Sequence, residues 1–263
     1  MRFTKMHGLG NDYLYVYAEV PENIESLSKE LSDRHFGAGS DGMIYISDSQ
    51  IADFKMRIFN ADGSEAKMCG NGIRCVGKFV YDKGYTDKTT LTVETLSGIK
   101  KLKLHVQGGK VKTVTVDMGQ AKVGDEWEIK VADKRIKYVP VDVGNPHAVV
   151  FVADAEKADV EGIGSKMEKH SAFPGGVNVE FVQVIDNHTL RMRVWERGSG
   201  ITMACGTGAC ASASAAVKAG LCDFGKPVTV MLDGGPLKIT VDRDFNITME
   251  GPAATVYEGE VAD

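Results

Sequence analysis

The chain has 263 residues, a net charge of −5, and 43% hydrophobic and 25% charged residues, a composition typical of globular proteins long enough for two domains. The acidic balance and the lack of a long basic run argue against a nucleic-acid partner. The sequence contains no apolar run of about 18 residues and no signal-peptide pattern at its N-terminus. We therefore expect a cytoplasmic protein without a membrane span.

In the first half of the chain, short alternating or β-branched runs predict that strands dominate, and turn residues bound most of them. A short helix is expected near residues 24–35. After Cys69, Ile73, Val76 and Val80 recur at helical spacing and predict a helix that ends at Lys83-Gly84. The expected strands cover residues 13–18, 43–47, 54–59, 90–95, 101–106 and 111–116.

The second half repeats this plan after a charged stretch, residues 121–135, which we interpret as a connection. A short helix is expected near residues 160–170. A longer helix should run from Cys205 to Lys218, with Gly220 as its stop, and its small Ala and Ser side chains would let a sheet approach closely. The expected strands cover residues 137–143, 148–152, 179–185, 189–195, 228–232, 237–241 and a segment at 245–252.

Two similar stretches suggest that the halves are copies of one another. "MCGNGIRC" (68–75) and "MACGTGAC" (203–210) place Cys69 and Cys205 136 positions apart (205 − 69), and Asn11 matches Asn145 at an offset of 134. Ordered matches at a nearly constant offset indicate an internal duplication. We predict an α+β fold of two pseudo-symmetric domains, 1–118 and 119–252, each a mostly antiparallel sheet or barrel around a central helix, with a ligand site in the cleft between them.

A cysteine directly before a helix has distinctive chemistry. The unpaired N–H groups and partial positive charge of a helix N-terminus favour thiolate over thiol and also bind carboxylates. Two such cysteines, Cys69 and Cys205, could hold an amino acid's α-carbon between them. One sulfur would remove the α-proton as thiolate, and the other would deliver a proton to the opposite face as thiol. This pattern predicts two-base racemisation or epimerisation without a cofactor.

The remaining cysteines are interpreted differently. Cys75, Cys210 and Cys222 are expected to be small core residues, since free cysteine is usually buried. An odd number of cysteines in a cytoplasmic chain argues against a disulfide framework, and the Cys and His spacings do not match a zinc site. We therefore expect no metal.

Several motifs, spread in order over nearly the whole chain, resemble those of the diaminopimelate epimerase family: "HGLGNDY", "RHFGAGSDG", "FNADGSEAKMCGNGIRC", "VGNPHAVVF", "GGVNVEF" and "WERGSGITMACGTGACA". The resemblance implies cofactor-independent interconversion of LL- and meso-diaminopimelate, on the route to lysine and peptidoglycan, by a homodimer. It implies that Cys69 and Cys205 are the acid/base pair, that His147 supports them, and that the tail 253–263 packs on the first domain. The implied substrate contacts are Asn11, Asn60, Gly70, Asn71, Asn145, Asn178, Glu196, Arg197, Gly206 and Thr207. The chain departs from the family pattern at Gly42, where many members have glutamine.

Three alternatives stay open. A proline racemase-like enzyme would use the same paired cysteines, although Glu196-Arg197 and "HGLGNDY" favour diaminopimelate. A racemase dependent on pyridoxal phosphate would need a Schiff-base lysine and a phosphate loop, and no convincing candidate for either is found. A thiol redox or binding protein would use Cys69 and Cys205 as a dithiol.

Overall fold

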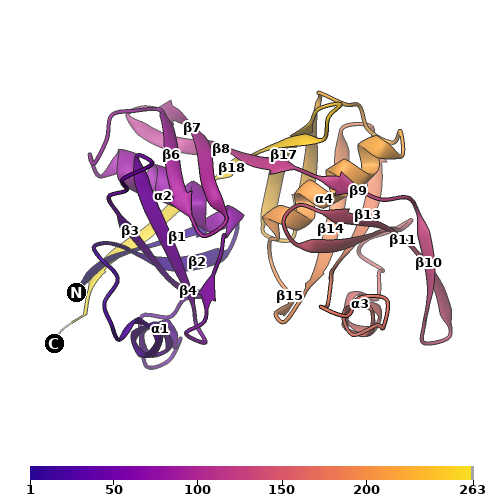
Figure 1. Ribbon diagram of the computed structural model, residues 1–263, viewed down its shortest axis with the longest axis horizontal. Coiled ribbons are helices and arrows are strands. Elements are labelled where there is room, and N and C mark those ends of the chain that lie inside the picture. Colours follow the sequence, from indigo (N-terminus) through magenta and orange to yellow (C-terminus); the bar gives the residue numbers. More distant parts are fainter. Residues whose placement is uncertain (262–263) are drawn as a thin grey trace. The chain divides into compact units, whose positions relative to one another are not determined.

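The computed structural model describes residues 1–261, and no helix within this range is both long and apolar enough to cross a bilayer. The described residues form four helices and nineteen strands (Figure 1), which confirms the expected sheet-dominated α+β class. The chain divides into two compact units. The first comprises residues 1–117 together with the C-terminal segment from Gly251, and the second comprises residues 118–250.

The first unit contains the helices α1 (Ile24–Ser32) and α2 (Gly70–Asp82). Its strands β2 and β3 pair in parallel, as do β4 and β6, whereas its other pairings are antiparallel. The strands that belong wholly or mostly to this unit are β1 (Arg2–Gly8), β2 (Asn11–Tyr17), β3 (Gly42–Ser47), β4 (Phe54–Asn60), β5 (Glu65–Ala66), β6 (Thr90–Thr95), β7 (Gly98–Gln107), β8 (Lys110–Gln120) and β19 (Ala254–Glu260).

The second unit contains α3 (Val160–Glu168) and α4 (Gly206–Lys218). Its parallel pairs are β12 with β13 and β14 with β16, which occupy the same places in the order of elements as the parallel pairs of the first unit. The strands of this unit are β9 (Lys122–Val123), β10 (Trp127–Val131), β11 (Lys134–Asp142), β12 (Pro146–Phe151), β13 (Asn178–Asp186), β14 (Thr189–Glu196), β15 (Gly200–Ile201), β16 (Pro227–Leu232), β17 (Gly235–Val241) and β18 (Asn246–Pro252).

The duplication can be followed in the strand registers, residue by residue. Leu14 lies opposite Met43 in the first unit, and Ala148 lies opposite Val179 in the second. Ala148 lies 134 positions after Leu14, and Val179 lies 136 positions after Met43, so these pairs match the offsets found in the sequence. The two units therefore repeat the same arrangement of paired strands, as the pseudo-symmetric prediction requires.

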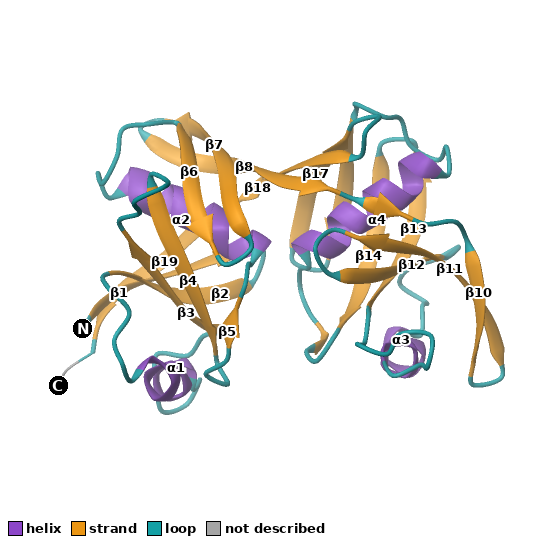
Figure 2. Ribbon diagram, in the orientation of Figure 1, coloured by secondary structure: helices purple, strands orange, loops and turns teal. Residues whose placement is uncertain are grey.

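Each long helix is buried among the strands of its own unit (Figure 2). Within α2, a Cβ at Gly77 would lie 2.8 Å from Leu104 Cδ2 and 3.0 Å from Leu102 Cδ2, so the missing side chain allows β7 to approach. In α4 the run of buried Ala and Ser residues has the same effect along the whole helix. Close packing on all sides fixes the position of each helix N-terminus, and thereby of the cysteine that precedes it.

Two segments contain strands that the sequence-based analysis did not predict. The charged stretch taken as a connection contains β10, which forms a hairpin with β11 from Trp127–Tyr138 to Val131–Lys134. Its apolar and charged residues alternate as in a strand, but the surrounding charged residues led to its interpretation as a connection. At the other end of the chain, β19 runs antiparallel to β1, from Arg2–Glu260 to His7–Ala254. Residues 262–263 of the expected tail lie outside the described residues.

Candidate active site

Both cysteines occupy the N-cap position of a long buried helix. Cys69 and Cys205 have extended backbones, with φ/ψ of −136°/115° and −114°/108°. Each sulfur accepts a hydrogen bond from the backbone N–H three residues later, Gly72 N and Gly208 N, at 3.3 Å in both cases. A side chain that satisfies an otherwise unpaired N–H is the usual N-cap arrangement, here made with sulfur. The two helix starts thus have the same local geometry.

In the first unit, amides surround the Cys69 sulfur. The thiol donates to Asn11 Oδ1 at 3.3 Å, and Asn71 Nδ2 donates to the same oxygen at 3.5 Å. Tyr13, on the strand that begins at Asn11, also contacts Cys69, and its burial raises the pKa of its hydroxyl. Cys69 is partly exposed, whereas Asn71 is buried. The structure therefore brings Asn11, Asn71 and Cys69 together.

Asn60 and Gly42 lie opposite one another where β4 pairs with β3. Asn60 Nδ2 donates to Ser64 Oγ at 3.0 Å. Gly42 has a φ of +154°, and a Cβ there would lie 2.1 Å from Phe59 O. A glutamine, which many family members are expected to have at this position, would require the backbone of this chain to shift.

In the second unit, acidic groups surround the Cys205 sulfur. Burial, followed by the charges of Glu196 and Glu180, raises the pKa of the Cys205 thiol well above its ordinary value. At Cys205 these effects oppose the helix N-terminus, which by itself favours the thiolate. Desolvation and two nearby carboxylates outweigh the partial charge of the helix end. Burial also raises the pKa of Glu196, which accepts a hydrogen bond from Thr202 Oγ1.

His147 connects this acidic cluster to Asn145. Its Nδ1 lies 2.6 Å from Glu180 Oε1, with both side chains fully buried, and its Nε2 lies 3.1 Å from Asn145 Oδ1. Both ring nitrogens therefore face an oxygen atom, so the imidazole links the Glu180 carboxyl group to the Asn145 amide. Asn145 Nδ2 in turn donates to Thr207 Oγ1 at 3.4 Å, and that hydroxyl lies 3.5 Å from the Cys205 sulfur.

Asn178 and Arg197 are placed by backbone contacts near this cluster. Asn178, opposite His147 in the sheet, donates to Pro146 O at 3.0 Å and accepts from Arg197 N at 3.0 Å. The Arg197 side chain donates to Gly175 O at 3.0 Å, and the residue is exposed. Asn178 thus holds the turn that carries Arg197, while the guanidinium stays accessible.

Glu180 was missed by the sequence-based analysis. It is fully buried, and its Oε2 finds no hydrogen-bond partner in the described part of the chain. A Cβ at Gly208 would lie 2.8 Å from Glu180 Oε1, so the glycine makes room for this carboxylate under the first turn of α4. The available signal was its position in "NVEF", two residues after Asn178 and therefore on the same face of the strand.

Comparisons with known proteins show matches over nearly the full length of the chain. The family model described as "Diaminopimelate epimerase" matches residues 3–124 and 139–256. A diaminopimelate epimerase of Methanococcus maripaludis is 52% identical over 99% of both chains, and one of Acetivibrio thermocellus is 53% identical over 99% of this chain and 98% of that one. A solved structure, a probable proline racemase from Agrobacterium radiobacter with bound carbonate, has a TM-score of 0.76 and 16% identity, covering 99% of this chain and 92% of that one. At that identity it shows a shared fold alone. The matches over nearly the full length show that the chain belongs to the diaminopimelate epimerase family.

Proposed function

We propose that the protein interconverts LL- and meso-diaminopimelate by a two-base mechanism, with Cys69 and Cys205 as the acid/base pair and no cofactor. Family membership supports the substrate and the reaction. The observation that carries the mechanism is the repeated helix start, in which each cysteine sulfur accepts an N–H bond at 3.3 Å. The proposal requires that, with substrate bound, the two sulfurs stand on opposite faces of the α-carbon.

The different surroundings of the sulfurs support a division of labour. Because its pKa is raised, Cys205 starts as a thiol and serves as the proton donor. Cys69, as thiolate, removes the α-proton and becomes a thiol, while Cys205 gives its proton to the opposite face and becomes a thiolate. The proton count is unchanged, and the roles are exchanged in the reverse direction. Helix N-termini would stabilise the negative charge that develops on the substrate carboxylate.

The remaining family positions are proposed as substrate contacts. The exposed guanidinium of Arg197 suits the distal carboxylate of diaminopimelate, and the half-buried carboxyl of Glu196 suits an ammonium group. Backbone N–H groups at Gly70-Asn71 and Gly206-Thr207 would bind the carboxylate at the reacting end. The amides assigned to the zwitterionic ends are Asn11, Asn60, Asn145 and Asn178, with His147 supporting the Cys205 side. We further propose a cytoplasmic homodimer that acts in lysine and peptidoglycan synthesis.

The test follows the reaction in deuterated water without added cofactor. Wild-type protein should convert LL-diaminopimelate to the meso form and incorporate deuterium at the inverted α-carbon. Cys69→Ala and Cys205→Ala should each reduce the rate at least 10²-fold, roughly the contribution of a positioned acid or base. Cys75→Ala and Cys210→Ala are matched controls, since they remove a thiol further along the same two helices.

Two results would contradict the proposal. Retained turnover in either Cys69→Ala or Cys205→Ala would exclude the two-base mechanism. Racemisation of L-proline by the wild-type protein, with no reaction of diaminopimelate, would instead favour the proline racemase-like alternative.

A further inference from the structure

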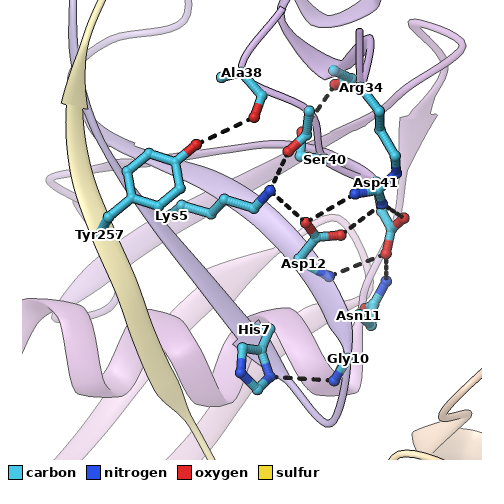
Figure 3. A network of polar contacts seen from close by, with 12 residues as sticks. Lys5, His7, Gly10, Asn11, Asp12, Arg34, Ala38, Ser40, Asp41 and Tyr257 are labelled. Carbon is cyan, nitrogen blue, oxygen red and sulfur yellow. Dashed lines mark hydrogen bonds and ion pairs between the residues drawn. The ribbon is translucent and has the colours of Figure 1, made fainter.

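The Asn11 side chain is held at both ends of its amide. Its Nδ2 donates to Asp41 Oδ2 at 2.8 Å, and its Oδ1 accepts from the Cys69 thiol at 3.3 Å and, more weakly, from Asn71 Nδ2 at 3.5 Å. Figure 3 shows the Asp41 carboxylate directly beside this amide. We propose that Asp41 is a positioning residue that fixes the Asn11 amide with its oxygen toward Cys69. The inference rests on the proposed function, because it assigns a role in the acid/base action of Cys69.

The orientation follows from hydrogen-bond chemistry. An amide has a donor end and an acceptor end, whereas an ionised carboxylate only accepts. If the Asn11 amide were reversed, its oxygen would face the Asp41 carboxylate with no proton between them. The bond to a charged acceptor would be lost and replaced by repulsion. Asp41 therefore permits only the orientation in which the oxygen faces Cys69.

Asp41 is itself held in a frame of charged residues (Figure 3). Arg34 Nη2 lies 2.8 Å from Asp41 Oδ1 and 2.8 Å from Asp12 Oδ1, and Lys5 Nζ lies 2.9 Å from Asp12 Oδ2. Two backbone N–H groups add hydrogen bonds to this frame. Asp12 N donates to Asp41 Oδ2 at 3.0 Å, and Asp41 N donates to Asp12 O at 2.8 Å. Two basic and two acidic side chains meet in this frame, so the Asp41 carboxylate is held in place by its ion pair and hydrogen bonds. Burial opposes the ionisation of Asp12, but its hydrogen bonds to Arg34 and Lys5 lower its pKa.

The second unit positions its equivalent asparagine differently. The residue that corresponds to Asp41 at the offset of 136 is Val177, which is buried and apolar. There, Asn145 Oδ1 faces His147 Nε2, and its Nδ2 faces Thr207. The acceptor end of Asn145 is thus occupied by histidine, whereas the acceptor end of Asn11 faces sulfur. The Asp41 frame is a feature of the Cys69 half.

The orientation has a chemical consequence for Cys69. An amide oxygen accepts a hydrogen bond from S–H but has nothing to donate to a thiolate. A reversed amide would donate to the thiolate and stabilise it, which would make Cys69 a weaker base. By preventing that reversal, Asp41 keeps the proton affinity of Cys69 high and gives the newly formed S–H an acceptor. Other titratable groups in this unit also interact electrostatically with Cys69. They are Tyr13 and Tyr15 of β2 and Cys75 of α2, and the charged Arg74 lies on that same helix.

A double-mutant cycle tests this inference on ligand-free protein. The rate at which iodoacetamide alkylates Cys69 is followed by mass spectrometry across a pH series, and the midpoint gives the apparent proton affinity of the thiol. Asp41→Ala should lower the midpoint by about one pH unit, the effect of one donated hydrogen bond on a thiolate. In the Asn11→Ala background the same substitution should shift it by less than about 0.3 unit, because no amide remains to reverse.

Arg34→Met is the matched control, since it breaks the ion pairs to Asp12 and Asp41 but leaves the Asp41–Asn11 bond. It should move the midpoint by less than about 0.3 unit. Should Asp41→Ala not fold, the cycle is run with Asp41→Ser, whose hydroxyl is too short to replace the carboxylate. An equal shift with and without Asn11, no shift at all, or a shift of about one unit in Arg34→Met would overturn the inference.

Alkylation does not depend on turnover, so a failed cycle is distinguishable from a failure of the proposed function. If both hold, Asp41→Ala also lowers kcat for diaminopimelate about tenfold, with a smaller change in KM, because a proton-transfer step is affected rather than binding. An unchanged kcat alongside the expected midpoint shift would contradict the catalytic part of the inference alone.

Discussion

The two cysteines have the same backbone setting but differ in what surrounds them. In the first unit the neighbouring strands supply groups without charge, and in the second unit the equivalent positions supply a histidine and two carboxyl groups. The pairs related by the duplication are Tyr13 and His147, Ile44 and Glu180, and Asn60 and Glu196. The comparison shows that the backbone geometry of the helix start can be kept while the charges around the cysteine change. A duplicated fold can keep one and change the other.

This asymmetry bears on the proposed two-base reaction. The reaction needs one proton shared between two sulfurs, and different surroundings decide which sulfur holds that proton before substrate binds. The contacts beneath the helix starts show the difference directly. A Cβ at Gly72 would meet Ile44 Cδ1 at 2.7 Å, whereas a Cβ at Gly208 would meet Glu180 Oε1 at 2.8 Å.

The largest expected effect comes from making the second unit resemble the first. Glu180→Ile leaves the buried His147 without its partner, and removing one side of a buried histidine–carboxyl pair is expected to cost about 3–5 kcal/mol. Because Glu180 Oε2 has no hydrogen-bond partner in residues 1–261, its removal offsets part of that cost. We expect the free energy of unfolding to fall by about 3 kcal/mol, measured by urea denaturation.

The double variant Glu180→Ile with His147→Tyr recreates the pair found in the first unit. It should recover more than half of the loss, since replacing both partners of a buried pair is often nearly neutral. Ile44→Val, in the first unit, serves as a control and should cost only about 1 kcal/mol. If the single Glu180→Ile variant were as stable as the double variant, the pairing of Glu180 with His147 would contribute nothing to stability.

A smaller effect is expected from removing one charge beside Cys205. After burial, the charge of Glu196 contributes most to raising the pKa of this thiol. A neutral amide stabilises the thiolate relative to the carboxylate, so Glu196→Gln should lower the alkylation midpoint of Cys205 by about one pH unit. The midpoint of Cys69 should not change. A rise in the Cys205 midpoint would show that Glu196 acts mainly as a hydrogen-bond acceptor.

The smallest effect concerns the short outer helices. In α3, Asp159 accepts a hydrogen bond from Gly162 N at 3.0 Å, whereas Asn23 at the start of α1 makes no side-chain cap bond. Asp159→Ala should therefore lower the free energy of unfolding by about 1 kcal/mol, and Asn23→Ala should lower it by less than about 0.5 kcal/mol. Thermal or urea unfolding measures both, and equal losses would contradict the capping difference.

Much of the fold could be predicted because its signals are local. The long helices were predicted to begin after Cys69 and Cys205, and the structure begins them at Gly70 and Gly206. By contrast, β1 was not predicted as a strand, and β10 was taken as a connection. Strand β1 pairs with β2 and with the distant β19, and pairing with a distant segment leaves little trace in the sequence of either strand. Strand β10 pairs with the adjacent β11, but its mostly exposed side chains lie in a charged stretch that was interpreted as a connection.

The sequence by itself determined the duplication, the two cysteine-capped helices and the family, because each rests on residue identity at a fixed spacing. The tertiary structure alone decided how each sulfur is surrounded. Glu180 and Asp41 act on Cys205 and Asn11 from strands and turns far away in the chain. Proton affinity depends on distance, burial and the direction of each hydrogen bond, and only folding sets these quantities.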